Sequence, residues 1–310
     1  MIVGFIKKGR LYKGNTHLHT TISDGHMEPE AVFEKYKARG YSFVVLTDHV
    51  KYFNSGRYNS DDFIVIPGVE LHVEHDFDNN RDQHVTGLYD PAAGETFEDG
   101  HAFNIPQISG YGLEAATGRI RILKDNANLV IYAHPVWSRI KPEKLMELTG
   151  YDAIEIWNHE CDFWSNSGDA TYHWDYLLKS GRQVNGIACD DLHQKDDRSL
   201  GGYIMVQADK LDNSSIADAI KRGNYYSSTG PEIDEFYIDD GILYAKGSKV
   251  KKISFMTNAR NRSYSGKTAE DSISSAEHKL IGDETYVRVE FKDFDGKRAW
   301  SNPIYFKDAE

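Results

Sequence analysis

The chain has 310 residues and a formal net charge of -12, and 40% of its residues are hydrophobic and 12% aromatic. These values fit one large globular domain or two, and they exclude a disordered chain. No long apolar run occurs, so the sequence predicts no membrane-spanning helix. The start lacks a secretory pattern and there are only two cysteines, Cys161 and Cys189, so we expect a cytoplasmic protein with reduced thiols.

Acidic residues and histidines are concentrated in the first 230 residues. This part carries a charge of -10 and twelve of the thirteen histidines, whereas residues 231–310 carry -2. An acidic body argues against binding along a nucleic acid polymer. It remains compatible with a small anionic substrate, because bound divalent cations would reverse the local field.

Predicted helices and strands alternate along the first 230 residues. Val32, Phe33 and Tyr36 give 28–40 a helical pattern that starts near Pro29, and 41–49 is an apolar run typical of a buried strand. The later elements are strands at 63–71, 83–89, 128–136, 151–158, 184–193 and 203–209, and helices at 113–127, 142–150, 172–181 and 214–223. About seven β-α units predict a parallel sheet and favour an α/β barrel over an open sheet.

The pattern changes near residue 231. Short β-like runs follow, including "EFYIDDGILYAKG" and "ETYVRVEFKD", with turn residues between them and no good helical pattern. We therefore expect two domains, a barrel over 1–230 and a small antiparallel β domain over 231–310.

Metal-competent side chains recur where the predicted strands end. His49 ends "FVVLTDH", Glu70 ends "FIVIPGVE", His134 ends "LVIYAH", and Asp191 and His193 end "GIACDDLH". Further upstream, "NTHLHTTISDG" holds His17, His19 and Asp24. The carboxyl ends of barrel strands meet on one face, so these side chains are expected to converge there. Several histidines and carboxylates without a cysteine pair favour zinc, manganese or iron.

In this order, "HLHTTISDG", "LTDH", "GVE", "AHP" and "DLH" resemble the motifs of the polymerase and histidinol phosphatase (PHP) family over residues 11–230. The resemblance implies a distorted seven-stranded β/α barrel with two or three divalent metal ions. Two further stretches, "YYSSTGPEI" (225–233) and "AWSNPIYF" (299–306), resemble a branch with a C-terminal β domain that includes carbamate-cleaving hydrolases.

The resemblance also implies a set of nine ligands. His17, His19 and Asp191 would hold the first metal, and Glu70 would bridge it to the second. The second metal would also take His134 and His84, for which His72, His75 and His101 are rivals. The third would take Asp24, His49 and His193. Asp190 competes with Asp191, but only Asp191 lies two residues before His193.

The expected function is hydrolysis of a small-molecule phosphate ester, such as a nucleotide or sugar phosphate, by a hydroxide that bridges two metals. Asp48 and His159 are candidates for the catalytic acid beside the bridging Glu70, and Asp48 alternatively orients a ligand or caps a turn. Candidate substrate-binding residues are Arg139, Asn158, Lys195 and Arg198, of which Asn158 alternatively caps a helix.

Two other functions remain open at this point. A hydrolase of carbamates, amides or esters would use the same metals, and a non-catalytic module would bind a phosphorylated ligand without turnover. A complete ligand set favours an enzyme over the second of these.

Overall fold

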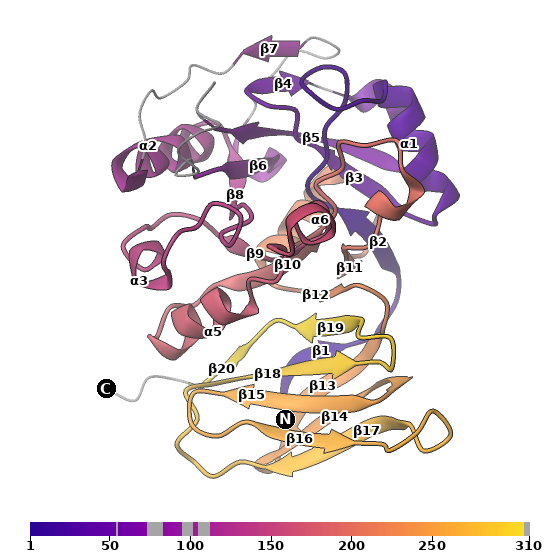
Figure 1. Cartoon of the computed structure of the whole chain (residues 1–310), viewed down its shortest axis with the longest axis vertical. Coiled ribbons are helices and arrows are strands. Elements are labelled where there is room, and N and C mark those ends of the chain that lie inside the picture. Colours follow the sequence, from indigo (N-terminus) through magenta and orange to yellow (C-terminus); the bar gives the residue numbers. More distant parts are fainter. Residues whose placement is uncertain (54, 73–82, 95–101, 105–111, 307–310) are drawn as a thin grey trace.

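The computed structural model describes residues 1–53, 55–72, 83–94, 102–104 and 112–306. Within these residues an α/β part stacks above a smaller all-β part (Figure 1). No helix in the described part of the chain is long and apolar enough to cross a membrane.

The elements of the α/β part follow the predicted order closely. Its strands are β2 (Leu11–Asn15), β3 (Phe43–Leu46), β5 (Ile64–Leu71), β6 (Val85–Tyr89), β8 (Asn128–Tyr132), β9 (Ala153–Asn158), β10 (Asn185–Cys189), β11 (Tyr203–Gln207) and β12 (Tyr225–Ser228). Its helices are α1 (Pro29–Ala38), α2 (Gly112–Asp125), α3 (Pro142–Leu145), α4 (His159–Ser165), α5 (Thr171–Lys179) and α6 (Asn213–Lys221), and β4 (Lys51–Phe53) pairs with β7 (Ala102–Asn104).

The large sheet is mixed, so the prediction of an all-parallel sheet was wrong. β2, β3 and β5 pair in parallel, as do β8, β9 and β10, but β6 is antiparallel to both β5 and β8, and β11 is antiparallel to β2. An antiparallel neighbour such as β6 needs no helical crossover after β5. Beyond the ends of β2 and β10, Leu18 and Leu192 form an isolated parallel bridge. The pairing of the named strands does not by itself close the sheet, so the closed barrel stays a prediction.

The all-β part contains the predicted antiparallel strands and one strand that was not foreseen. Its strands are β1 (Ile2–Ile6), β13 (Ile233–Asp239), β14 (Ile242–Val250), β15 (Lys252–Thr257), β16 (Arg262–Ser265), β17 (Ile273–Lys279), β18 (Tyr286–Lys292), β19 (Arg298–Ser301) and β20 (Ile304–Tyr305). The N-terminal strand β1 pairs with β13, and the pairing of β12 with β19 continues the large sheet into β18, β15 and β16 of the all-β part. Buried Phe236, Phe255 and Phe291 lie in the hydrophobic core of this part.

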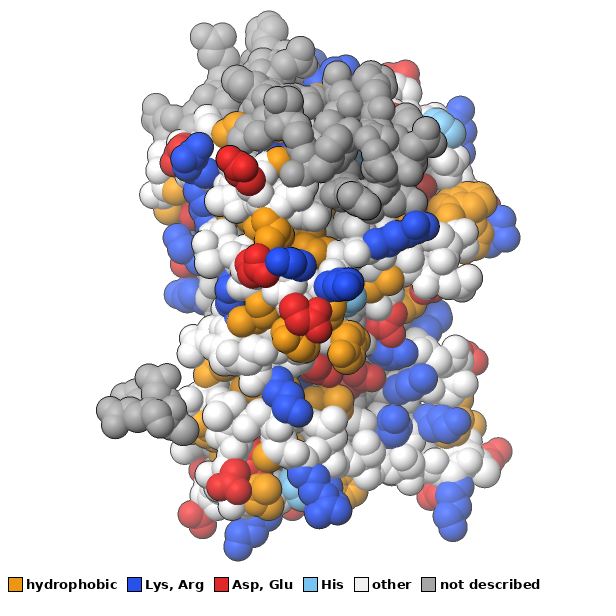
Figure 2. Space-filling model, turned by 60° about the vertical axis from the view of Figure 1, so that its left-hand side comes forward, with side chains coloured by type: hydrophobic (Ala, Val, Ile, Leu, Met, Phe, Trp, Pro, Cys, Tyr) orange, Lys and Arg blue, Asp and Glu red, His pale blue; other side chains and the backbone are white. Residues whose placement is uncertain are grey.

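Charge is mixed on the surface. On the face drawn in Figure 2, lysine and arginine side chains are interspersed with aspartate and glutamate over both parts.

Candidate metal centre

Four buried side chains converge beyond the carboxyl ends of β2 and β10 and near the end of β5. The Nε2 atom of His17 lies 3.1 Å from His19 Nε2, 3.1 Å from Asp191 Oδ1 and 3.2 Å from Glu70 Oε2. His19 Nε2 lies 3.2 Å from each of the same two carboxylate oxygens. Four ligand atoms placed tetrahedrally at about 2.0 Å from a zinc ion would be about 3.3 Å apart. This first group therefore has the spacing of a tetrahedral cation site.

The chemistry of the first group also fits a cation. The Oδ1 atom of Asp191 is buried and lies 3.1 and 3.2 Å from Nε2 of His17 and His19, but it makes no hydrogen bond of good geometry to a described residue. A buried carboxylate oxygen without a partner is costly unless a positive charge satisfies it. Two imidazole nitrogens and two carboxylate oxygens are suitable ligands for a divalent metal.

Glu70 extends the cluster to a second group, because its two oxygens face different neighbours. Its Oε2 atom belongs to the first group, whereas Oε1 lies 2.9 Å from His84 Nδ1 and 3.1 Å from His134 Nε2. Of the rivals to His84, the ring of His72 instead lies against His49 with 4.0 Å between centroids. His75 and His101 lie outside the described residues.

A third group lies beside the first and is closer to solvent. Asp24 lies 3.5 Å from His19 Nδ1, 3.4 Å from His49 Nε2 and 3.6 Å from His193 Nε2. The Asp24 side chain is 55% exposed, which makes this group the accessible side of the cluster. The chain can bring Asp24 here because Gly25 follows it, and a Cβ atom on Gly25 would lie 2.5 Å from the His19 backbone.

The protonation of the cluster reflects strong mutual attraction. Burial alone would lower the pKa of His19, but attraction to the carboxylates of Asp191 and Glu70 outweighs it and raises the pKa to about 10. Burial would raise the pKa of Glu70, but the surrounding histidines hold it well below its usual range. In the metal-free chain, protons on His17 and His19 therefore balance the buried carboxylates.

Glu155, which was not predicted from the sequence, contacts His17, His134 and Asn158. Its Oε1 atom lies 2.7 Å from Nδ1 of His17, and its Oε2 accepts hydrogen bonds from the His134 backbone N–H and the Asn158 side chain. A carboxylate at Nδ1 fixes the ring so that Nε2 faces the site. The available signal was a single glutamate inside the apolar strand "AIEIW".

A β-bulge in β9 explains how Glu155 and Asn158 reach the same place. The pairing of β9 with β10 skips a residue, so that Ile187 lies opposite Glu155 and Ala188 opposite Trp157. A bulge interrupts the strict alternation of side chains. Asn158 consequently donates to Glu155 Oε2 at 3.0 Å and to Asp191 Oδ2 at 2.9 Å.

Asn158 and Asp48 act on other protein groups. The Asn158 Oδ1 atom accepts a hydrogen bond from the Cys161 backbone N–H and so caps α4. Helix capping was one of the two roles predicted for Asn158. The fully buried Asp48 carboxylate accepts hydrogen bonds from the backbone N–H groups and hydroxyls of Thr20 and Ser23. Asp48 therefore fixes the segment that connects His19 to Asp24, and the structure does not bring it into the three groups.

Asp190 and His159 also point away from the cluster. Asp190 accepts from the backbone N–H groups of Gly201 and Gly202 at 2.6 and 2.8 Å, so Asp191 is the member of the pair that joins the first group. The Nε2 atom of His159 donates to the Arg198 carbonyl at 2.8 Å, and its ring lines a separate pocket. A strand end places neighbouring side chains on opposite faces, and His159 takes the face away from Asn158.

The predicted cationic substrate ligands are all exposed. Arg139 occupies a turn with φ 52°, the Lys195 carbonyl accepts from Lys35, and Arg198 pairs with Asp196. None of these contacts involves a member of the three groups, so their role toward substrate stays a prediction.

Two candidate ligands are held in left-handed backbone. His134 has φ 24° and Asp191 has φ 58°, conformations that cost energy for residues other than glycine. Such strain is found preferentially where function fixes the direction of a side chain.

A solved structure is similar to the chain over nearly its full length. A two-domain protein from Bacteroides vulgatus that contains a predicted PHP-like metal-dependent phosphoesterase aligns with 97% of this chain and 98% of its own, at 13% identity and a TM-score of 0.50. The chain has a PHP-like two-domain fold. The resemblance predicted from the sequence motifs is thereby confirmed at the level of fold.

Two further solved structures match a smaller share of the chain. A Bifidobacterium adolescentis protein named as a metal-dependent phosphoesterase matches over 59% of this chain and 88% of its own, at 17% identity and a TM-score of 0.38. A Chromobacterium violaceum amidohydrolase with bound sulfate and no metal matches over 60% and 89%, at 15% identity and a TM-score of 0.40. No family model and no curated protein matches the chain.

Proposed function

We propose that this PHP-like protein is a metal-dependent phosphoesterase that hydrolyses a small-molecule phosphate ester. The observation that carries the proposal is the convergence of three overlapping groups of imidazole and carboxylate ligands. They are His17, His19, Glu70 and Asp191; Glu70, His84 and His134; and His19, Asp24, His49 and His193.

The ligand set suits two or three divalent ions, which we propose are zinc, manganese or iron. Nitrogen and carboxylate oxygen are ligands common to these metals, and the nearby thiol of Cys189 lies with His17 and Glu155 in a fourth cluster outside the three groups. Bound divalent ions lower the pKa of water and neutralise charge on phosphoryl oxygens, which is the chemistry that phosphate ester hydrolysis needs.

The residues of the chain prepare the site for that chemistry. Glu70 spans two groups with its two oxygens, and Glu155 keeps Nε2 of His17 available by accepting a hydrogen bond from Nδ1–H. Substrate would approach from the side of Asp24 and His193, whose side chains are 55% and 22% exposed while Glu70 is 1% exposed. The two buried groups that share Glu70 would therefore hold metal, and the more exposed group around Asp24 would contact the substrate.

A substrate panel tests the proposal. Protein freed of metal and then supplied separately with zinc, manganese or iron(II) is assayed with phosphomonoesters, phosphodiesters, carboxylic esters, carbamates and amides. We expect release of phosphate or of an alcohol from a phosphate ester with at least one metal, and none after chelation. Turnover restricted to carbamates, amides or esters would replace this proposal with the alternative hydrolase, and phosphate binding without any turnover would support a non-catalytic module.

Three finer expectations accompany the proposal. We propose that the segments beyond β2 and β10 close the sheet into a distorted barrel, because the N–H of His19 donates to the Leu192 carbonyl and that of Asp191 to the His17 carbonyl. We retain a functional division near residue 230 and a cytoplasmic location as proposals. A small phosphorylated molecule, and no nucleic acid polymer, is the proposed partner.

A further inference from the structure

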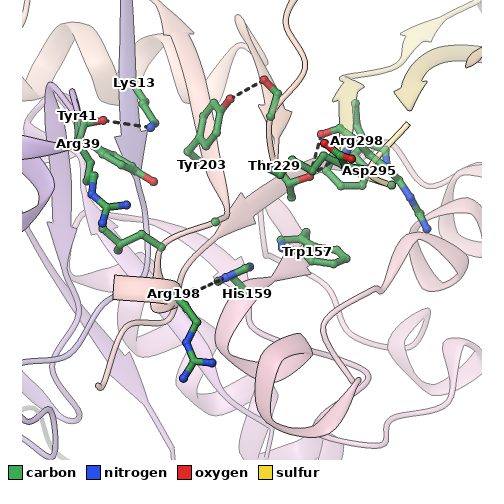
Figure 3. Close-up of a pocket in the computed structure, with 16 residues that line it drawn as sticks. Lys13, Arg39, Tyr41, Trp157, His159, Arg198, Tyr203, Thr229, Asp295 and Arg298 are labelled. Atoms are coloured by element: carbon green, nitrogen blue, oxygen red, sulfur yellow. Dashed lines mark hydrogen bonds between the residues drawn. The ribbon is translucent and has the colours of Figure 1, made fainter. Parts of the chain in front are cut away.

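A second pocket lies beside the metal centre, between the α/β part and the turn that connects β18 to β19 (Figure 3). It has a volume of about 590 Å³, within the range typical of small-molecule sites. Trp157 and His159 contribute from the end of β9, and Lys13, Arg39 and Tyr41 come from one side, opposite Asp295 and Arg298 (Figure 3). None of the nine proposed metal ligands is among the described residues that line it.

The lining of this pocket is cationic, although the chain as a whole has a net charge of -12. Its charged residues are Lys13, Arg39, Arg198, Lys297 and Arg298, opposed by the single carboxylate of Asp295. Arg198 and Arg298 also have carboxylate partners outside the pocket. A cluster of one sign in a chain of the opposite sign creates a local field that favours an anionic ligand.

Aromatic faces accompany the positive charge. The ring of Trp157 stacks on buried Trp300 with 6.3 Å between centroids and an angle of 28°, and Trp157 itself is partly exposed in the pocket. Across the pocket, the Lys13 ammonium group lies 4.0 Å from the Tyr41 ring centroid and 4.5 Å from that of Tyr203. Planar rings stack on such aromatic walls, which a simple inorganic anion does not exploit.

Hydrogen-bonding atoms in the lining are also without partners. The indole Nε1 atoms of Trp157 and Trp300 and the Nδ1 atom of His159 are buried and have no hydrogen-bond partner among the described residues. Because Nε2 of His159 donates to the Arg198 carbonyl, Nδ1 of the neutral ring is an acceptor. These three atoms are covered by protein atoms, so the proposed ligand contacts do not include them.

We propose that this pocket is a binding site for a nucleoside phosphate, separate from the metal centre. The base packs against Trp157, and the phosphate faces the cationic side chains. Glycine at position 201 keeps His159 in the lining, since a Cβ atom there would lie 2.2 Å from the His159 ring. The pocket and the metal centre meet at residues 157–159, where Asn158 contacts Asp191 and its two neighbours line the pocket.

Calorimetry on the full chain tests this site with AMP, adenosine and inorganic phosphate as probes. The Glu70→Ala variant is used beside the unmodified chain, because it removes the bridging carboxylate of the metal centre and leaves the pocket intact. We expect AMP to bind Glu70→Ala and the unmodified, metal-free chain with equal affinity, and about tenfold more tightly than adenosine or phosphate.

Charge reversal at the pocket provides the decisive variants. Lys297 and Arg39 are exposed, so Lys297→Glu and Arg39→Glu are expected to fold normally, and thermal unfolding checks this. Each should weaken AMP binding about tenfold or more, whereas Lys267→Glu, a reversal at an exposed lysine outside the pocket, should not change it.

Two results would overturn the proposal. One is AMP affinity that is lost in Glu70→Ala but unchanged in Lys297→Glu and Arg39→Glu, which would place the nucleotide at the metal centre. The other is the absence of AMP binding to the metal-free chain at millimolar concentration. Neither result bears on whether the metal-loaded protein hydrolyses phosphate esters, so the two proposals fail independently.

Discussion

Replacing Glu155 by glutamine should weaken metal binding although Glu155 belongs to neither of the two groups that share Glu70. The Oε2 atom of Glu155 accepts two N–H groups, from His134 at 2.9 Å and from Asn158 at 3.0 Å, so the glutamine carbonyl is expected to occupy this position. The new NH₂ group then faces Nδ1 of His17, which lies 2.7 Å from Oε1 in the native chain. His17 can accept this donor only with its proton on Nε2, and that proton blocks the lone pair directed at the first group.

Outer partners of metal-bound histidines typically contribute about 10–100-fold to affinity or activity, which corresponds to about 1.4–2.7 kcal/mol. We expect a loss of this size for Glu155→Gln in competitive titration with a chelating dye. Glu147→Gln, at an exposed carboxylate paired with Lys144, serves as the control. A folded Glu155→Gln variant with native affinity would refute the inferred role of the Glu155–His17 hydrogen bond.

Further predictions concern the ligands, protons and stability. Glu70→Ala should reduce activity by more than the roughly 100-fold of an outer partner, because Glu70 serves two groups, whereas His26→Ala at an exposed position should matter little; equal activity and metal content in both variants would contradict this assignment. Metal binding should release protons and tighten as the pH rises toward 10, because the pKa of His19 in the metal-free chain is about 10, and titration in two buffers of different ionisation enthalpy measures the release. In the metal-free chain, protonation of His19 contributes fully to the free energy of unfolding below pH 6.5, and this contribution is lost as the pH rises through 10. If the contribution of His19 to the free energy of unfolding did not change with pH between these values, the raised pKa would be contradicted. Free metal at 100 times its dissociation constant should stabilise the fold by about 2.7 kcal/mol, so chelation should lower the melting temperature and resupply should restore it, and an unchanged melting temperature would count against binding to the folded state.

The convergence of the candidate ligands could be predicted from the sequence because most of them lie where hydrophobic runs stop. Strand ends are visible as changes from apolar to polar residues, and parallel neighbours such as β3 and β5 bring those ends together. Glu70 and His49 lie in adjacent positions for this reason, and an isolated parallel bridge links them. Local sequence was sufficient to locate these side chains without knowledge of the complete topology.

Side-chain direction was harder to predict. The bulge in β9 places Glu155 and Asn158 together, and no local pattern in "AIEIWN" reveals an interruption of the alternation. His159 was predicted as a candidate catalytic acid, and the structure places it as the first residue of α4, in the lining of the other pocket. Pairing of β1 with β13 joins segments more than 200 residues apart, which periodicity cannot predict.

Anomalous X-ray diffraction from crystals of the metal-loaded protein tests the central claim most directly. Data collected on both sides of the metal absorption edge locate each ion independently of the protein density. The account predicts ions coordinated by both oxygens of Glu70, one beside His17 and His19 and one beside His84 and His134. Ions found only elsewhere on the protein, with Glu70 coordinating none at saturating metal, would contradict it.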